Sequence, residues 1–364
     1  MKHIRKDERL MEKKGKDFTD KYFNLKNSLL YFAFFILISA VSMYYINKIY
    51  SQGSNLDVFF SFSPVVIISL IGLLFFYYIF DASRLYFVLK TLNAEISFWN
   101  VYKLVFINFF ISNITPLATG GGFAQVYFLQ KKGVPLGKSS AAALIRTLLS
   151  ATMLFLSVPF IILRNQSMLN LLPGNYVFIY FAVFLVLYVF ILYILIFKVR
   201  LVMKILYKLF YFIKSKHLLS KKRFRKIVRY IFEHLELFSE DLAFFIQGKK
   251  FFVFLSLFFT GIFLLTEFSF SFLIIKGLGY TNISFFQILT SQILVVFIMY
   301  FAPTPGAAGI AEGGYSLLFA RFVNRSDLFP LLFYWRFFSK FIGIFIGVFV
   351  FFFLIIRGGQ EVEE

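Results

Sequence analysis

Two arginines stand inside segments that are otherwise apolar enough to cross a membrane. Arg146 lies seven residues into the segment 139–163, and Arg336 lies seven residues into the segment 329–356. Seven helical residues rise about 10 Å, so each guanidinium is expected below the lipid headgroups. An arginine at the centre of a membrane helix costs about 2.5–3.5 kcal/mol on insertion scales, so each of the two needs a compensating partner. A phosphate held by paired hydrogen bonds would be one partner, while snorkelling or bonds to freed backbone carbonyls are the structural alternatives.

Two carboxylates lie in similarly apolar surroundings. Glu312 follows a Pro-Gly-Ala-Ala-Gly run, where it is expected in the first turn of a half-helix. There it would be stabilised by the helix dipole, or would pair with Arg336 or with a cationic headgroup. Glu267, within the segment 250–275, is interpreted either as a cation or proton site or as the partner of an arginine.

Glu312 belongs to the second copy of a repeated motif, and Arg336 lies in the apolar segment that follows that copy. The first copy reads Pro116-Leu-Ala-Thr-Gly-Gly-Gly-Phe-Ala-Gln-Val126 and the second reads Pro303-Thr-Pro-Gly-Ala-Ala-Gly-Ile-Ala-Glu-Gly313, so that Gln125 aligns with Glu312. Proline and glycine interrupt helices, and a paired interruption in membrane-depth sequence indicates a binding site between two repeats. The residues predicted to form this substrate site are Pro116, Gly121, Gly122, Gln125, Arg146, Glu267, Pro305, Gly306, Gly309, Glu312 and Arg336.

The composition requires a membrane to surround these residues. The chain has 364 residues, of which 60% are hydrophobic, and its mean hydropathy is +0.79. Such a chain has too few polar residues to cover a soluble surface. Segments of a length that crosses the hydrocarbon core occur at 28–48, 64–83, 139–163, 174–197, 250–275 and 329–356. We therefore predict an all-α polytopic membrane protein with about six full spans and two broken, re-entrant helical hairpins.

The residue inventory excludes several kinds of site. The chain has no cysteine, and its three histidines (His3, His217 and His234) all lie in polar segments. Neither a metal centre nor a catalytic residue is therefore predicted, and no cofactor is expected. The glycine-rich motifs lack the lysine and hydroxyl residues of a nucleotide-binding loop, so nucleotide binding is not predicted either.

The distribution of positive charge predicts the topology. Residues 1–27 carry nine Lys and Arg and residues 198–229 carry twelve, whereas the loop 49–63 carries none. Basic segments remain in the cytoplasm, so the net charge of +20 reflects topology rather than nucleic-acid binding. We expect a multi-pass protein of the bacterial inner membrane with a cytoplasmic N-terminus.

The same rule places the two motifs on opposite faces. Both ends of 99–138 fall on the cytoplasmic side, and both ends of 285–325 fall outside. The motifs would then be re-entrant hairpins related as an inverted repeat. If both segments cross fully instead, the repeats would be parallel.

This topology divides the chain into five parts. The segment 198–249 shows apolar residues at three- and four-residue spacing, typical of an amphipathic helix on the membrane surface or of a small soluble helical hairpin. The expected parts are a cytoplasmic basic tail 1–27, a first membrane half 28–197, a cytoplasmic amphipathic linker 198–249, a second membrane half 250–357 and a tail 358–364.

Both motifs are similar to one family. Gly121-Gly-Phe-Ala-Gln-Val-Tyr-Phe-Leu129, Lys131-Lys-Gly-Val-Pro-Leu-Gly137 and Ala143-Leu-Ile-Arg146 resemble the lysylphosphatidylglycerol synthase transmembrane region. Thr304-Pro-Gly-Ala-Ala-Gly-Ile-Ala-Glu312 and Tyr334-Trp-Arg336 resemble its second signature. The family usually has glutamate where this chain has Gln125. The resemblance implies a flippase-like membrane domain, without the soluble synthetase domain of the bifunctional members.

Three functions are compatible with these observations. The first is a lipid flippase that moves a phospholipid, such as aminoacylated phosphatidylglycerol, between leaflets. The second is a lipid-modifying transferase, of the phosphatidylglycerol lysyltransferase type or dependent on a polyprenyl phosphate, with Glu312 or Glu267 as its acid or base. The third is a non-catalytic partner of a separate synthetase or glycosyltransferase. The oligomeric state is not predicted.

Overall fold

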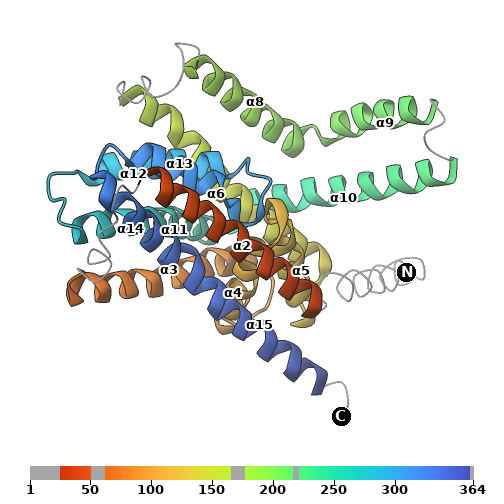
Figure 1. The fold of residues 1–364 in the computed structure, drawn as a ribbon. Helices are drawn as coiled ribbons and strands as arrows, with labels where there is room; N and C mark the ends of the chain where they lie inside the picture. Colours follow the sequence, from red (N-terminus) through yellow and green to blue (C-terminus); the bar gives the residue numbers. More distant parts are fainter. Residues whose placement is uncertain (1–24, 51–61, 165–176, 216–220, 361–364) are drawn as a thin grey trace. The chain divides into compact units, whose positions relative to one another are not determined.

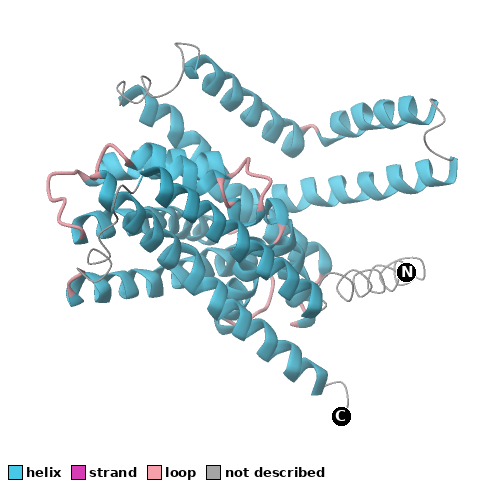
Figure 2. Ribbon diagram, in the orientation of Figure 1, coloured by secondary structure: helices cyan, strands magenta, loops and turns pink. Residues whose placement is uncertain are grey.

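The fold of the described residues is entirely helical. The computed structural model describes residues 25–50, 62–164, 177–215 and 221–360, and every regular element in these ranges is a helix (Figure 2). The all-α prediction is therefore confirmed. The predicted tail 1–27, the loop 49–63 and the tail 358–364 fall largely outside the described residues.

The helices follow the order of the apolar segments (Figure 1). The first half comprises α2 (Leu25–Tyr50), α3 (Pro64–Thr91), α4 (Phe98–Ile114), α5 (Thr119–Lys131), α6 (Leu136–Arg164) and α8 (Val177–Phe197). The middle of the chain forms α9 (Val199–Ser215) and α10 (Lys221–Gln247). The remainder comprises α11 (Lys250–Gly277), α12 (Phe285–Met299), α13 (Ile310–Phe319), α14 (Arg325–Arg336), a π-helical turn (Phe337–Phe341) and α15 (Ile342–Gln360).

Five of the predicted spans correspond to helices that are long and apolar enough to cross a membrane. They are α2, α3, α6, α11 and the continuous run from α14 through α15. A sixth span is counted if α8 and α9, which are bent by 101° relative to each other, are taken together. The chain is therefore a multi-pass membrane protein with five to six candidate spans among its described residues.

The helices form two compact units. The first contains residues 1–82, 98–132 and 262–364, and the second contains residues 83–97 and 133–261. The first unit therefore holds α2, both broken motifs and the run from α14 to α15. The second unit holds α6, α8, α9 and α10.

In the first unit, two glycines allow α15 to pack closely on α4. Gly343 and Gly347 are one turn apart, and a Cβ atom on Gly347 would lie 2.4 Å from the carbonyl oxygen of Phe106. Small residues at this spacing let two helix backbones approach each other in a membrane, where dispersion contacts replace the hydrophobic effect. The aromatic rings of Phe110 and Phe351 then pack with their centroids 5.8 Å apart.

The second unit is built around α6. The described part of the predicted linker 198–249 forms α9 and α10, and α10 packs on both α9 and α6. Leu242 and Phe245 of its predicted apolar stripe are buried. Asp241 has a raised pKa because of partial burial and the neighbouring charge of Glu240, while Lys138 opposes the shift.

The close approach at Gly347 gives a testable consequence. Gly347→Leu should lower the free energy of unfolding by about 1–3 kcal/mol, because the added side chain overpacks the α4 backbone. Thermal unfolding of the purified protein in detergent measures the effect. Gly72→Leu is the matched control, since a Cβ atom there meets nothing within 4 Å. Equal melting temperatures for the two variants would contradict the proposed helix contact.

Candidate functional site

Both repeated motifs form helical hairpins around a short turn. In the first, α4 and α5 pack on each other and are joined by a 3-10 turn at Pro116–Ala118. In the second, α12 and α13 pack on each other around a 3-10 turn at Pro305–Ala307. Both hairpins belong to the first unit. The prediction that the Pro and Gly residues interrupt the helices is confirmed.

The tips of the two hairpins meet. The turn Pro116–Ala118 contacts the turn Pro305–Ala307, and α4 also contacts the second turn. A Cβ atom on Gly306 would lie 3.3 Å from the carbonyl oxygen of Asn113 and 2.5 Å from the ring of Phe35 in α2. Gly306 also has a φ of +56°, in the left-handed region that favours glycine. Position 306 therefore favours glycine for two reasons: a side chain would collide with its neighbours, and the backbone is in the left-handed region.

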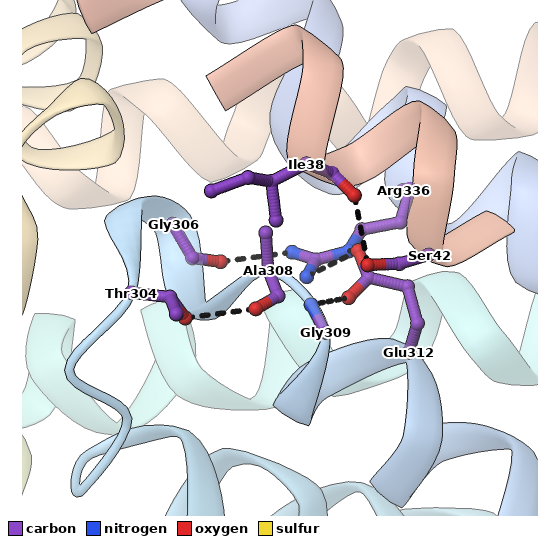
Figure 3. A network of polar contacts seen from close by, with 8 residues as sticks. All are labelled: Ile38, Ser42, Thr304, Gly306, Ala308, Gly309, Glu312 and Arg336. Atoms are coloured by element: carbon purple, nitrogen blue, oxygen red, sulfur yellow. Dashed lines mark hydrogen bonds and ion pairs between the residues drawn. The ribbon is translucent and has the colours of Figure 1, made fainter. Parts of the chain in front are cut away.

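A buried ion pair joins the second break to α14 (Figure 3). Nε of Arg336 donates to Oε1 of Glu312 at 2.7 Å, and Nη2 lies 2.7 Å from the same oxygen. The side chains are 1% and 0% exposed, so water does not screen the pair. The guanidinium also lies 5.1 Å from the ring centroid of Trp335.

The side chains of Glu312 and Arg336 also form hydrogen bonds with the backbone at the helix break. Oε2 of Glu312 accepts a hydrogen bond from the Gly309 amide at 2.6 Å, which caps α13. Nη1 of Arg336 donates to the Gly306 carbonyl at 3.3 Å, and the Thr304 hydroxyl donates to the Ala308 carbonyl at 2.8 Å (Figure 3). Glu312 is therefore both a first-turn carboxylate and the partner of Arg336, two roles that were predicted from the sequence as alternatives.

The first hairpin uses neutral groups at the corresponding place. Nδ2 of Asn108 in α4 lies 2.9 Å from the Gly121 carbonyl and 3.2 Å from Oε1 of Gln125, and donates to both. Gln125 is 1% exposed. A Cβ atom on Gly121 would fall on the Ser112 hydroxyl at 1.7 Å, so this glycine allows α5 to approach α4. The two hairpins therefore have similar geometry but different charge.

The end of α11 and the start of α14 are also fixed together. The Tyr280 hydroxyl donates to Oδ2 of Asp327 at 2.5 Å and accepts from the Asn324 amide at 2.8 Å. Burial and this carboxylate raise the pKa of Tyr280 to about 12, so the hydroxyl remains protonated at neutral pH. These bonds connect the two helices that flank the second hairpin.

A second ion pair was not predicted from the sequence. Nζ of Lys340, in the π-helical turn, lies 3.4 Å from Oε1 of Glu267 in α11. Both side chains are 12% exposed, and Nζ is 5.4 Å from the centroid of the Phe109 ring. The predicted arginine partner of Glu267 is therefore replaced by a lysine.

Arg146 belongs to the second unit and is 7% exposed. Arg84 of α3 is equally buried and donates to the hydroxyl of Ser150. That hydroxyl in turn donates to the carbonyl of Arg146 at 3.4 Å. Two buried guanidinium groups are thus carried by α3 and α6.

The structure brings some predicted site residues together and leaves others apart. Gly306, Gly309, Glu312 and Arg336 form one cluster, with Pro305 buried in the turn beside it. Pro116, Gly121, Gly122 and Gln125 belong to the first hairpin, whose turn contacts that of the second. Among the described residues no group of three or more His, Asp or Glu side chains could hold a metal ion.

The ion pair at the second break can be tested by its effect on stability. Glu312→Gln should lower the free energy of unfolding by about 3–5 kcal/mol, because it leaves the buried charge of Arg336 without a counter-charge. Thermal and chemical unfolding in detergent measure the loss. Glu95→Gln, at an exposed position, should change stability by less than about 0.5 kcal/mol. Similar effects of the two substitutions would contradict a stabilising role of the pair.

Comparison with known proteins identifies the family. No curated protein and no solved structure gave a significant match. A family model described as the lysylphosphatidylglycerol synthase TM region matches residues 30–347, which include both hairpins and both ion pairs. The chain therefore belongs to the family of the lysylphosphatidylglycerol synthase transmembrane region.

Proposed function

We propose that this protein is a lipid translocase of the bacterial inner membrane, which moves a phospholipid between the two leaflets. The observation that carries the proposal is the meeting of two hairpin tips beside a buried ion pair within one apolar unit. Broken helices at membrane depth are tolerated where they are buried in protein or line a polar cavity. In transporters such breaks commonly form the substrate site.

The charges near the breaks suit a lipid headgroup. A phosphate that leaves the interface loses its hydration, and guanidinium or ammonium groups are the side chains that best replace it. The first unit carries Arg336 and Lys340 on one helical run, each balanced by a carboxylate. The carboxylates keep these cations neutralised when no headgroup is bound, which lowers the cost of burying them.

The tip-to-tip contact also supports the predicted inverted repeat. Two hairpins that enter from opposite faces would meet at their turns near the middle of the membrane, and the turns at Pro116–Ala118 and Pro305–Ala307 are in contact. The positive-inside rule then assigns the first hairpin to the cytoplasmic face, together with the N-terminus. A headgroup would reach the contact from either side in turn.

A lipid-modifying transferase is the less favoured reading. Such an enzyme needs a carboxylate that can accept or deliver a proton, and the two predicted candidates, Glu312 and Glu267, are each engaged in an ion pair. An acid or base must contact the reacting group of the substrate, and each of these carboxylates instead contacts a cation of the protein. We therefore assign the synthesis of the lipid to a separate synthetase or glycosyltransferase.

Transport by the purified protein tests the proposal. Proteoliposomes with a fluorescent phosphatidylglycerol should show protein-dependent exchange between leaflets, measured by quenching the outer label. If Arg146 contacts the phosphate, as its depth in an apolar segment predicts, Arg146→Ala should lower the initial rate about tenfold, equivalent to about 1.4 kcal/mol. Arg200→Ala, which removes an exposed arginine from α9, is the matched control and should leave the rate unchanged.

A lipid analysis of a strain that lacks the protein separates transport from synthesis. A translocase predicts a normal amount of the lipid in the wrong leaflet. The complete absence of an aminoacylated or glycosylated lipid would instead support the transferase. If exchange in proteoliposomes requires a second protein, the role as a non-catalytic partner is favoured.

A further inference from the structure

Two cations lie on the same helical run, and each is paired with a carboxylate from a different helix. Arg336 ends α14 and pairs with Glu312 of α13, whereas Lys340 lies in the following π-helical turn and pairs with Glu267 of α11. All four side chains belong to the first unit. The two pairs can therefore be compared directly.

The pairs differ in tightness and in access. The Arg336 pair has two contacts of 2.7 Å, an additional bond to the Gly306 carbonyl, and side chains at most 1% exposed. The Lys340 pair has one contact of 3.4 Å, and each side chain is 12% exposed. A ligand that displaced Glu312 would break the cap of α13 and release the second hairpin tip, whereas one that displaced Glu267 would break a single long contact.

The π-helical turn orients the side chain of Lys340 differently from that of Arg336. In a regular α-helix, residues four apart share one face, so Lys340 would lie beside Arg336. The turn at Phe337–Phe341 inserts an extra residue, which rotates the following side chains relative to those before it. Lys340 consequently faces Glu267 and the ring of Phe109 in α4. Single π-helical turns of this kind are frequent at functional sites.

The ammonium group of Lys340 also retains donor capacity. An ammonium has three N–H donors. Within the described part of the chain, the one hydrogen bond assigned to Lys340 is the long contact with Glu267. A phosphate oxygen could accept a further hydrogen bond from the Lys340 ammonium, or could replace the Glu267 carboxylate as its partner. Neither event would change the contacts of Glu312 and Arg336 at the second break.

We propose that Lys340 binds the phosphate of an anionic phospholipid headgroup, with Glu267 as the counter-ion that it exchanges for this phosphate. Arg336 and Glu312 then form a structural latch that keeps the second hairpin tip in place. This inference rests on the proposed function, since it names the residue that contacts the transported lipid. Glu267 competes with the ligand, so its removal strengthens binding.

Binding of a short-chain phosphatidylglycerol to the purified full-length chain in detergent tests the proposal, with phosphatidylcholine as the zwitterionic comparison. Glu267→Gln should increase the affinity for phosphatidylglycerol several-fold, because the competing carboxylate charge is removed. Lys340→Gln should reduce this affinity about tenfold, and Lys340→Arg should largely restore it. Phosphatidylcholine should respond less, since it carries no net negative charge.

Control variants separate binding from folding. Glu267→Gln combined with Lys340→Gln removes both charges and leaves neither unpaired, so it should fold while losing the preference for phosphatidylglycerol. Glu312→Gln, which opens the latch, should not increase phosphatidylglycerol affinity. If Glu267→Gln leaves the affinity unchanged or lowers it, or if the double variant keeps its preference, the proposal is wrong. Equally tight binding of soluble glycerol phosphate would overturn the assignment to a lipid.

The assay also distinguishes this proposal from the function on which it rests. Binding in detergent requires no second leaflet, so the predicted affinity changes without transport in proteoliposomes would overturn the translocase alone. Transport that persists at the wild-type rate in Lys340→Gln, with unchanged phosphatidylglycerol affinity, would overturn the role of Lys340 alone.

Discussion

A helix that breaks in a medium without water leaves backbone amides and carbonyls that must find partners inside the protein. At the second hairpin, one ion pair supplies partners on both sides of the break. Glu312 accepts from the Gly309 amide, and Arg336 donates to the Gly306 carbonyl. The charge of each side chain neutralises the other, which lowers the cost of burying both charges. The same two side chains also provide hydrogen-bond partners for the backbone groups at the break. The position of the α13 half-helix depends on this double use.

The first hairpin solves the same problem without charge. Asn108 donates to the Gly121 carbonyl and to the Gln125 side chain, and close helix contact at Gly121 replaces electrostatic attraction. Neutral amide bonds are weaker than charge-assisted ones but cost less to bury. The two hairpins therefore share a shape rather than a set of charges, and Gln125 occupies the place in the first hairpin that Glu312 holds in the second.

Much of this arrangement could be predicted from the sequence, because the relevant signals are local. Long apolar runs predicted the spans, Pro and Gly predicted both breaks, and Arg336 was one of the partners considered for Glu312. Lys340 was missed because a regular helical pattern places it beside Arg336, and a π-helical turn has no clear sequence signal. The burial of Arg84 was missed because a basic residue after an apolar run is ordinarily a topology marker. Gly343 and Gly347 were overlooked, although their four-residue spacing was available as a known helix-packing signal.

The glycine contact between α4 and α15 limits how the first unit can move. A backbone carbonyl of Phe106 occupies the space where Gly347 would otherwise carry a side chain. Such an interlocked surface resists sliding, because any axial shift would bring the larger side chains that flank each glycine against the facing backbone. Helix α4 of the first hairpin and helix α15 therefore move together as one rigid body. Any rearrangement that tilts this hairpin must also swing the C-terminal end of α15.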